Sequence, residues 1–316
     1  MRIGLLGYGN IAKKHLAALT ELIEVEVAAI YDVQAIEAPE GIEAYTDLDN
    51  FLAHDLDLVT VCSPNGFHKE HSLKALQAGH HVICEKPFAL SSIDCQIMIE
   101  TADRNQKKIY CTMQNRFSPV SQWLQSLVTT QSLGNLYLVN VACYWNRNKN
   151  YYAGSDWRGK LGKDGGTLFT QFSHYVDTLY WLFGSMQIHS AHFANFDHED
   201  MIEFEDTGVF NFSFDKGGMG TFSYTTSCYE KNFESSLTLL GSKGTVKVGG
   251  QYMDRVDFCN VEGLQPPTLS ANDNLSNIRA IYLQASLDVA GKENKATKAV
   301  DGLAVVELIE AVYGFR

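Results

Sequence analysis

The chain has 316 residues, 45% of them hydrophobic, which is enough for two packed domains or one large one. Its formal charge of −12, from 25 basic and 37 acidic residues, argues against nucleic acids and anionic membranes as partners. No run of about 18 apolar residues is present, so we expect no membrane span. Seven scattered cysteines without a CxxC pair are typical of reduced thiols, which predicts a cytoplasmic protein without a cysteine metal site.

The first 32 residues follow the pattern of a dinucleotide-binding site. Apolar residues 3–6 predict a short strand, and a glycine turn follows, made of Gly7, Tyr8, Gly9, Asn10 and Ile11. Apolar residues at helical spacing come next, then a strand over residues 25–31 that ends on Asp32. In such a site the glycines permit a tight turn and a close approach to a pyrophosphate, which binds at the helix start. The alternative, a strand-turn-helix without a ligand, does not account for the acidic residue.

Asp32 indicates which dinucleotide is bound. It lies 25 residues beyond Gly7, where its carboxylate can accept hydrogen bonds from both ribose hydroxyls. A carboxylate repels a 2′-phosphate, and the following Val33 and Gln34 offer no cation to bind one. We therefore predict NAD rather than NADP as the cofactor.

Strands and helices continue to alternate up to residue 113. We expect a helix start at residues 46–49, helices over 67–78 and 91–105, and strands over 56–63, 81–84 and 108–113. This alternation indicates a doubly wound parallel sheet of six strands, an α/β Rossmann fold. We place the boundary between a domain over residues 1–117 and a second domain over residues 118–316.

Polar residues follow two of these strands, at the sheet edge where cofactors bind. Ser63, Pro64 and Asn65 follow one strand, and Lys86 follows the next. Pro87 restricts the backbone of Lys86. Position alone leaves Lys86 open between an active-site residue and a solvated lysine at the start of a loop.

The second half of the chain has a strand-rich pattern. Alternating segments predict strands over residues 136–145, 188–196, 207–214, 220–226, 235–240, 245–248 and 255–261. Helices are expected from Ser118 to near Gly134 and over residues 167–183, 276–289 and 301–313. The pattern predicts an α+β domain with a mostly antiparallel sheet, of which one covered face would be enough.

Residues 144–158 are unusually aromatic and basic for an acidic protein, and include Tyr152, Trp157 and Arg158. Aromatic rings beside Arg and Lys side chains suit a base or sugar ring together with a phosphate. The alternative is a surface loop with unrelated aromatic residues.

The helix expected over residues 167–183 carries a polar face. Thr170, His174 and Asp177 stand at i, i+4 and i+7, with Gln171 beside the first of them. A lone histidine in a helix is usually structural, whereas this one shares its face with polar residues near a glycine-rich start. No further ligands at metal spacing are present, so proton transfer is the better functional interpretation of His174.

Together these motifs resemble the Gfo/Idh/MocA oxidoreductase family across essentially the whole chain. The matching pieces are the glycine turn with His15, the Pro64-Asn65 loop with His68, Glu85-Lys86-Pro87, and Gly165 through His174 to Asp177. The resemblance implies a Rossmann domain, a C-terminal domain with a large open sheet, and NAD(P)-dependent action on hydroxyls of sugars or cyclitols. It assigns Lys86 to the reacting hydroxyl and nicotinamide ribose, and His174 to acid–base catalysis. An exposed apolar face of an open sheet predicts a homodimer or homotetramer.

Within the family, the chain is similar to the branch that oxidises UDP-activated N-acetylated hexuronates at C3. The similarity predicts further cofactor contacts at Ser63, Pro64, Asn65, His68, Glu85, Lys86 and Gln114. It predicts substrate contacts at Lys86, Asn115, Arg116, Tyr152, Trp157, Arg158, Thr170, Gln171 and His174. Arg116 and Arg158 are the cations expected to hold the nucleotide-sugar. Thr170 stands where many members have aspartate, which removes a carboxylate from the proton relay.

We therefore expect an NAD-dependent dehydrogenase that acts on a UDP-linked N-acetylated amino sugar or its uronate. A second possibility keeps the fold and the catalytic pair but takes a free aldose or inositol as substrate. A third is a protein that binds NAD(H) as a sensor without catalysis, although a sensor would not need both Lys86 and His174.

Overall fold

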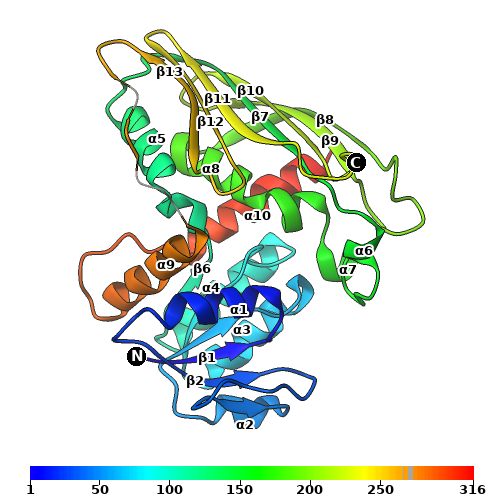
Figure 1. Cartoon of the computed structure of the whole chain (residues 1–316), viewed down its shortest axis with the longest axis vertical. Coiled ribbons are helices and arrows are strands. Elements are labelled where there is room, and N and C mark those ends of the chain that lie inside the picture. The colour runs from blue at the N-terminus through cyan, green and yellow to red at the C-terminus, as the bar shows by residue number, and fades with distance from the viewer. Residues whose placement is uncertain (266, 270–272) are drawn as a thin grey trace. The chain divides into compact units, whose positions relative to one another are not determined.

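The computed structural model describes residues 1–265, 267–269 and 273–316, and the chain forms two compact units (Figure 1). The first unit contains Met1–Gln114 and Asp273–Val306, and the second contains Asn115–Asn272 and Glu307–Arg316. The boundary proposed between residues 117 and 118 lies three residues beyond the first of these divisions.

In the described part of the first unit, six parallel strands form one sheet in the order β3-β2-β1-β4-β5-β6. They are β1 Arg2–Leu6, β2 Glu26–Tyr31, β3 Glu43–Tyr45, β4 Leu58–Val61, β5 His81–Cys84 and β6 Ile109–Cys111. All four residues of β4 are buried, as expected of a parallel strand covered on both faces. The doubly wound parallel sheet is thus confirmed. The strand that the sequence did not locate is β3, which is short and largely exposed.

Helices of the first unit begin where capping residues predict. They are α1 Asn10–Leu19, α2 Leu48–Leu52, α3 His68–Gln77, α4 Ser92–Arg104, α9 Asn274–Val289 and the first part of α10 Ala299–Tyr313. Asp47 caps α2 and Ser91 caps α4, each accepting a hydrogen bond from a backbone amide of the first turn. Short 3-10 turns at Asn65–Phe67 and Gln114–Phe117 follow β4 and β6. The polar residues that follow these strands therefore lie at the carboxyl edge of the sheet.

The described residues of the second unit form a seven-stranded sheet in the order β13-β12-β11-β7-β10-β9-β8. Its strands are β7 Leu136–Tyr144, β8 Met186–Ala194, β9 Thr207–Phe214, β10 Met219–Thr225, β11 Glu234–Gly241, β12 Gly244–Gly249 and β13 Arg255–Val261. Only the central β7–β10 pair is parallel, which confirms the mostly antiparallel sheet.

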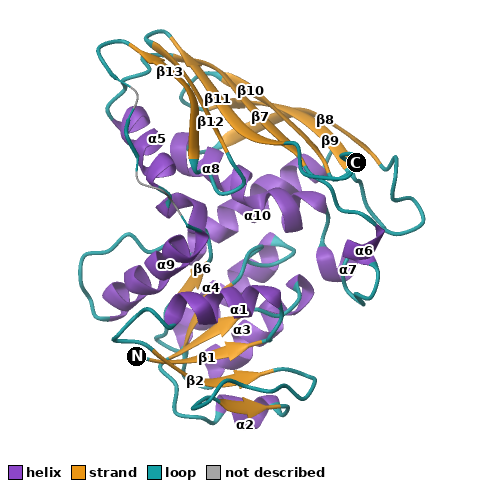
Figure 2. Ribbon diagram, viewed as in Figure 1, coloured by secondary structure: helices purple, strands orange, loops and turns teal. Residues whose placement is uncertain are grey.

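The helices of the second unit lie on one face of this sheet (Figure 2). They are α5 Pro119–Thr129, α6 Lys149–Tyr152, α7 Leu161–Asp164, α8 Ser173–Phe183 and the last part of α10. A π-helical turn, Leu168–Phe172, precedes α8, so the expected helix over residues 167–183 is wider in its first turn. α5 ends at Thr129, before Gly134, whose φ of +66° turns the chain toward β7 instead.

Aromatic side chains form the core between sheet and helices. Phe172 packs edge to face on Trp145 at 4.9 Å between centroids and lies 5.5 Å from the ring of Tyr224. Phe210 and Phe222 stack at 4.9 Å on neighbouring strands and are fully buried. Among the described residues, no helix combines the length and apolar character that crossing a membrane requires.

Candidate active site

The glycine turn leaves room for a ligand at the start of α1. Gly7 has φ +92°, and a Cβ there would lie 2.9 Å from the backbone nitrogen of Ser63, so only glycine fits. A Cβ on Gly9 would meet no described atom within 4 Å, and no described side chain caps α1. The first amides of this ten-residue helix are therefore available to a pyrophosphate.

Asp32 is fixed by two backbone amides at the end of β2. Tyr8 N donates to Oδ2 at 2.8 Å, and Gln34 N donates to Oδ1 at 3.0 Å. Each oxygen keeps a second lone pair that can accept from a ribose hydroxyl. The glycine turn, the uncapped helix and this carboxylate together fit NAD.

His68 joins the two loops at the sheet edge rather than facing solvent. Its Nδ1 lies 2.6 Å from the Pro87 carbonyl oxygen and its Nε2 lies 2.9 Å from the Ser63 carbonyl oxygen. The ring is 1% exposed, and burial lowers the pKa of His68. The structure therefore brings the Ser63-Pro64-Asn65 loop and the Lys86-Pro87 segment together through this side chain.

Glu85 is buried behind Lys86 in a polar network. Its Oε1 lies 2.8 Å from Nε2 of His15, and its Oε2 accepts from the Lys86 amide at 3.1 Å. His15 Nδ1 lies 2.7 Å from the hydroxyl of Tyr282, which also contacts Thr60 Oγ1 at 2.9 Å. The network fixes the backbone of Lys86 relative to α1 and α9.

Gln114 and Asn115 follow β6 and are both buried. The Oε1 of Gln114 and both amide atoms of Asn115 lack a hydrogen-bond partner among the described residues. Buried amides of this kind are normally satisfied, so these two fit groups that bind a ligand.

Thr170 contacts a carboxylate that its own position lacks. Its Oγ1 donates to the carboxylate of Asp164 and lies 3.0 Å from the Asp164 carbonyl oxygen. Asp164 is 2% exposed, and its Oδ2 accepts from the Gly159 amide at 2.7 Å. The fold thus supplies a buried acidic group beside Thr170, and the sequence analysis did not assign Asp164 a role. The signal for it was the Asp164-Gly165-Gly166 turn, in which Gly165 has φ +92°.

Arg116 and Asp177, which the sequence placed on different elements, form a buried ion pair. Arg116 Nη2 and Nε donate to the Asp177 carboxylate at 2.5 and 3.0 Å, and both residues are at most 7% exposed. The Arg116 guanidinium also lies 5.7 Å from the Trp181 ring. Its charge is matched by Asp177, and its contact with substrate stays a prediction.

The aromatic and basic stretch divides into a buried part and an accessible part. Tyr152 packs in a small cluster with Ile202 and Phe204. Arg158 is half-buried, lies 4.5 Å from the Tyr151 ring and 5.4 Å from the Trp157 ring, and donates to the Tyr151 carbonyl at 3.1 Å. The rings therefore organise the guanidinium, as expected for an anion-binding loop.

Arg147 is a site residue that the sequence analysis did not select. Its guanidinium lies between the rings of Trp145 and Tyr151, at 4.8 and 5.1 Å from their centroids. Its Nε donates to Gln171 Oε1 at 2.7 Å, and Gln171 Nε2 donates to the Tyr151 hydroxyl at 2.8 Å. Gln171 stands three residues before His174, which is 9% exposed. The structure thus joins the loop to the segment that carries His174.

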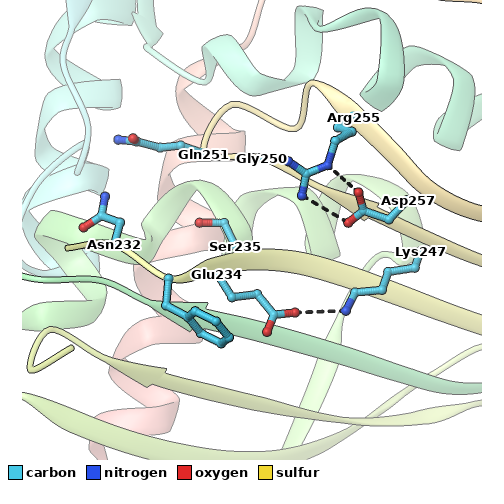
Figure 3. Close-up of a pocket in the computed structure, with 9 residues that line it drawn as sticks. Asn232, Glu234, Ser235, Lys247, Gly250, Gln251, Arg255 and Asp257 are labelled. Carbon is cyan, nitrogen blue, oxygen red and sulfur yellow. Dashed lines mark hydrogen bonds and ion pairs between the residues drawn. The ribbon is translucent and has the colours of Figure 1, made fainter. Parts of the chain in front are cut away.

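A separate pocket of about 380 Å³ opens beside β11, β12 and β13 (Figure 3). Figure 3 shows Arg255 facing Asp257 and Lys247 facing Glu234, with Lys247 Nζ at 3.0 Å from Glu234 Oε1. Both positive charges in the pocket are matched by carboxylates, and none of the residues expected to bind cofactor or substrate lines it.

These features define a Rossmann-type dinucleotide-binding protein with a second domain built on an open sheet. Residues 1–113 match the model of an oxidoreductase family with an NAD-binding Rossmann fold, and residues 121–247 match the GFO/IDH/MocA C-terminal domain. The chain belongs to the GFO/IDH/MocA oxidoreductase family, and its first domain is an NAD-binding domain.

Solved structures similar over the whole chain include two dehydrogenases. The WlbA dehydrogenase of Bordetella pertussis, in complex with NADH and UDP-GlcNAcA, is 32% identical with a TM-score of 0.90. The match covers 100% of this chain and 96% of that one. The WlbA dehydrogenase from Chromobacterium violaceum, in complex with the same two ligands, is 31% identical with a TM-score of 0.89, over 100% and 93% of the two chains.

Curated relatives match over a shorter region. Glucose-6-phosphate 3-dehydrogenase of Bacillus subtilis strain 168 is 32% identical over 58% of this chain and 54% of that protein. D-glucoside 3-dehydrogenase of Escherichia coli K12 is 29% identical over 62% and 58% of the two proteins. The chain therefore matches little more than half the length of these relatives.

The Tyr282→Phe substitution tests the network behind Lys86. Removing the hydroxyl leaves buried groups of His15 and Thr60 without their partner, which should lower the free energy of unfolding by about 1–3 kcal/mol. Urea denaturation measures the loss, with Tyr137→Phe, on an exposed tyrosine, as the matched control. A loss no larger than that of the control would contradict the network.

His198 should make stability depend on pH. Its Nδ1 lies 3.0 Å from Asp206 Oδ2 and its Nε2 lies 2.6 Å from the Arg147 carbonyl oxygen. Burial opposes the imidazolium, but the bonds to Asp206 and to this carbonyl outweigh it and raise the pKa of His198 above 6.5. The stabilisation should be complete below the unfolded pKa and lost as the pH rises through the raised folded value. Melting temperatures across this range should show His198→Gln most destabilised at the acidic end; a constant difference would refute this.

Proposed function

We propose that the protein is an NAD-dependent dehydrogenase that oxidises a ring hydroxyl of a UDP-linked N-acetylated amino sugar or hexuronate at C3. The observation that carries the proposal is the pair of arginines, Arg147 and Arg158, on Tyr151, joined through Gln171 to the His174 segment. Aromatic rings with guanidinium groups suit a nucleotide-sugar. Whole-length similarity to two enzymes crystallised with UDP-GlcNAcA supports the same substrate class.

In the proposed reaction the bound nicotinamide accepts a hydride from the sugar carbon. Lys86 donates a hydrogen bond to the reacting oxygen and orients the ring, while His174 takes the hydroxyl proton directly or through a water. Orienting donor and acceptor in this way accounts for much of the rate. Glu85, through the Lys86 amide, and Gln171, through its bond to Arg147, are positioning residues for this pair.

A second candidate function is oxidation of a sugar without a nucleotide. The similarity to enzymes named glucose-6-phosphate 3-dehydrogenase and D-glucoside 3-dehydrogenase favours it. It uses the same fold and the same Lys86 and His174 chemistry. The two candidates differ in what occupies the loop around Tyr151.

A panel of substrates separates these candidates. Purified protein with NAD is mixed with UDP-N-acetylhexosamines, UDP-hexuronates, free sugars, sugar phosphates and inositols, and NADH absorbance is followed. We expect a signal with UDP-linked sugars. A signal confined to the sugars without a nucleotide would support the second candidate instead. NAD binding with silence throughout would point to a sensor.

Lys86→Ala and His174→Ala should separate catalysis from cofactor binding. Each should lower kcat by about 10²–10⁴-fold, since each removes a group that acts on the reacting hydroxyl. The dissociation constant of NAD, measured by calorimetry, should change far less than turnover. Unchanged turnover in either variant would refute the role of that residue.

We also propose that the chain assembles as a homodimer or homotetramer through the uncovered face of its sheet. The residues of that face are mostly hydroxyl and amide side chains, among them Asn140, Thr221 and Thr238, rather than the apolar ones expected from the sequence. Leu138, Val209 and Met219 add apolar area on the same face. A broad face almost without charge at its centre is suited to association with a second copy. A cytoplasmic location is proposed too, because five of the seven thiols are buried and all seven are free.

The Thr221→Arg substitution tests this assembly. A charge at the centre of the face would be desolvated in the complex, so the mass from light scattering should fall toward that of one chain. Gln96→Arg, on an exposed position of α4, is the control and should leave the mass unchanged. An unchanged mass in Thr221→Arg would place the interface elsewhere.

A further inference from the structure

Arg147 is a partly buried cation whose hydrogen bonds all go to neutral acceptors. Besides Gln171, its guanidinium donates to the Asn146 carbonyl at 2.8 Å and approaches Asn232 Oδ1 at 3.4 Å. Burial lowers the pKa of Arg147, and the neighbouring Arg158 charge acts in the same direction. No carboxylate among the described residues pairs with it, so its charge is not compensated within the unit.

Arg158 repeats the same situation on the same tyrosine. Its Nη1 donates to the Tyr151 carbonyl, while its buried Nε has no acceptor among the described residues. A buried guanidinium N–H without an acceptor is costly, and two like charges near one ring repel each other. An anion bound between them would relieve both costs.

The other arginines of the second unit are different. Arg116 pairs with Asp177, Arg255 with Asp257 and Arg316 with Glu205. Within the described residues of this unit, Arg147 and Arg158 are thus the two arginines without a carboxylate partner. This distribution selects Arg147, rather than Arg116, as the cation that acts with Arg158.

The backbone of Arg147 is fixed on both sides. Its amide donates to the Thr226 carbonyl at 2.8 Å, and its carbonyl oxygen contacts His198, which is itself paired with Asp206. The rings of Trp145 and Tyr151 fix the guanidinium between them. A preorganised cation of this kind loses little entropy when it binds an anion.

We propose that Arg147 and Arg158 form a two-guanidinium subsite that binds the diphosphate of the substrate, with the Tyr151 ring between them. The inference rests on the proposed function, because it names the part of the nucleotide-sugar that this loop recognises. Two guanidiniums present several N–H donors, which match two phosphoryl groups better than a single carboxylate. Because Arg147 also donates to Gln171, the bound diphosphate orders the segment that carries His174.

Calorimetric titration of the NAD-loaded protein with UDP and with uridine tests the subsite. Arg147→Met should weaken UDP binding by about 10- to 100-fold and change uridine binding by less than about twofold, since uridine has no phosphate. Arg147→Lys should be intermediate, because a lysine keeps the charge but not the planar set of donors. Arg104→Met, an exposed arginine of the first unit, is the matched control, and melting temperatures show whether each variant folds.

The outcomes separate the subsite from the proposed function. Equal weakening of UDP and uridine would show that Arg147 only supports the loop, and unchanged UDP binding would overturn the subsite. If the wild type binds no UDP, the nucleotide-sugar function fails, and the same variants are titrated with pyrophosphate and glucose 6-phosphate. Loss of those anions in Arg147→Met would retain the subsite for a sugar phosphate, and no anion binding by the wild type would overturn it. Binding of a hexuronate without phosphate, lost in Arg147→Met, would reassign it to a carboxylate.

Discussion

The hydrogen bond from Arg147 to Gln171 is the interaction on which the second unit's site depends. It joins the loop that follows β7 to the π-helical turn that precedes α8. Without it, the aromatic loop and the His174 segment would be separate surface features of one sheet domain. A π-helical turn widens the helix by one residue, and such turns are frequent at functional sites. Here the widened turn contains both Thr170 and Gln171, which contact Asp164 and Arg147.

Each proposed catalytic residue has buried polar groups behind it. Behind Lys86 lie Glu85 and His15, and on the His174 segment Gln171 leads to Arg147 and His198. Such supporting groups restrict the positions that an active side chain samples, and they do so without touching the substrate. Charged groups are used for this purpose in both units, and each is satisfied by a specific partner, as buried charges must be.

The strands and most helices could be predicted from sequence because they depend on local periodicity. β4 and β5 are continuous apolar runs, and Ser118 with Pro119 marks the start of α5 in the way that helix capping requires. β3 could not be located, since its three residues are largely exposed and carry no periodic signal. The end of α5 was placed too late because Gly134 marks the turn before β7 and not the helix end.

The site was only partly predictable, because its contacts join residues that are distant in sequence. The glycine turn and Asp32 form a local motif, so they could be recognised directly. The Arg116–Asp177 pair spans 61 residues, and no pattern in one sequence indicates that this cation is already matched. The same limit applies to Arg147, whose role depends on Gln171, 24 residues later. Charge type was visible in the sequence, and charge compensation was not.

The first unit is assembled from two separate parts of the chain, and this affects the order of folding. Residues 273–306 belong to it, and Tyr282 from this segment completes the polar network of His15 and Thr60. A ribosome makes the intervening sheet unit before it reaches Tyr282. The nucleotide-binding half, although it is synthesised first, therefore cannot close its interior until after the other half has emerged. Until then His15 and Glu85 lack part of their native surroundings, and a nascent chain would have to be protected from aggregation during that interval.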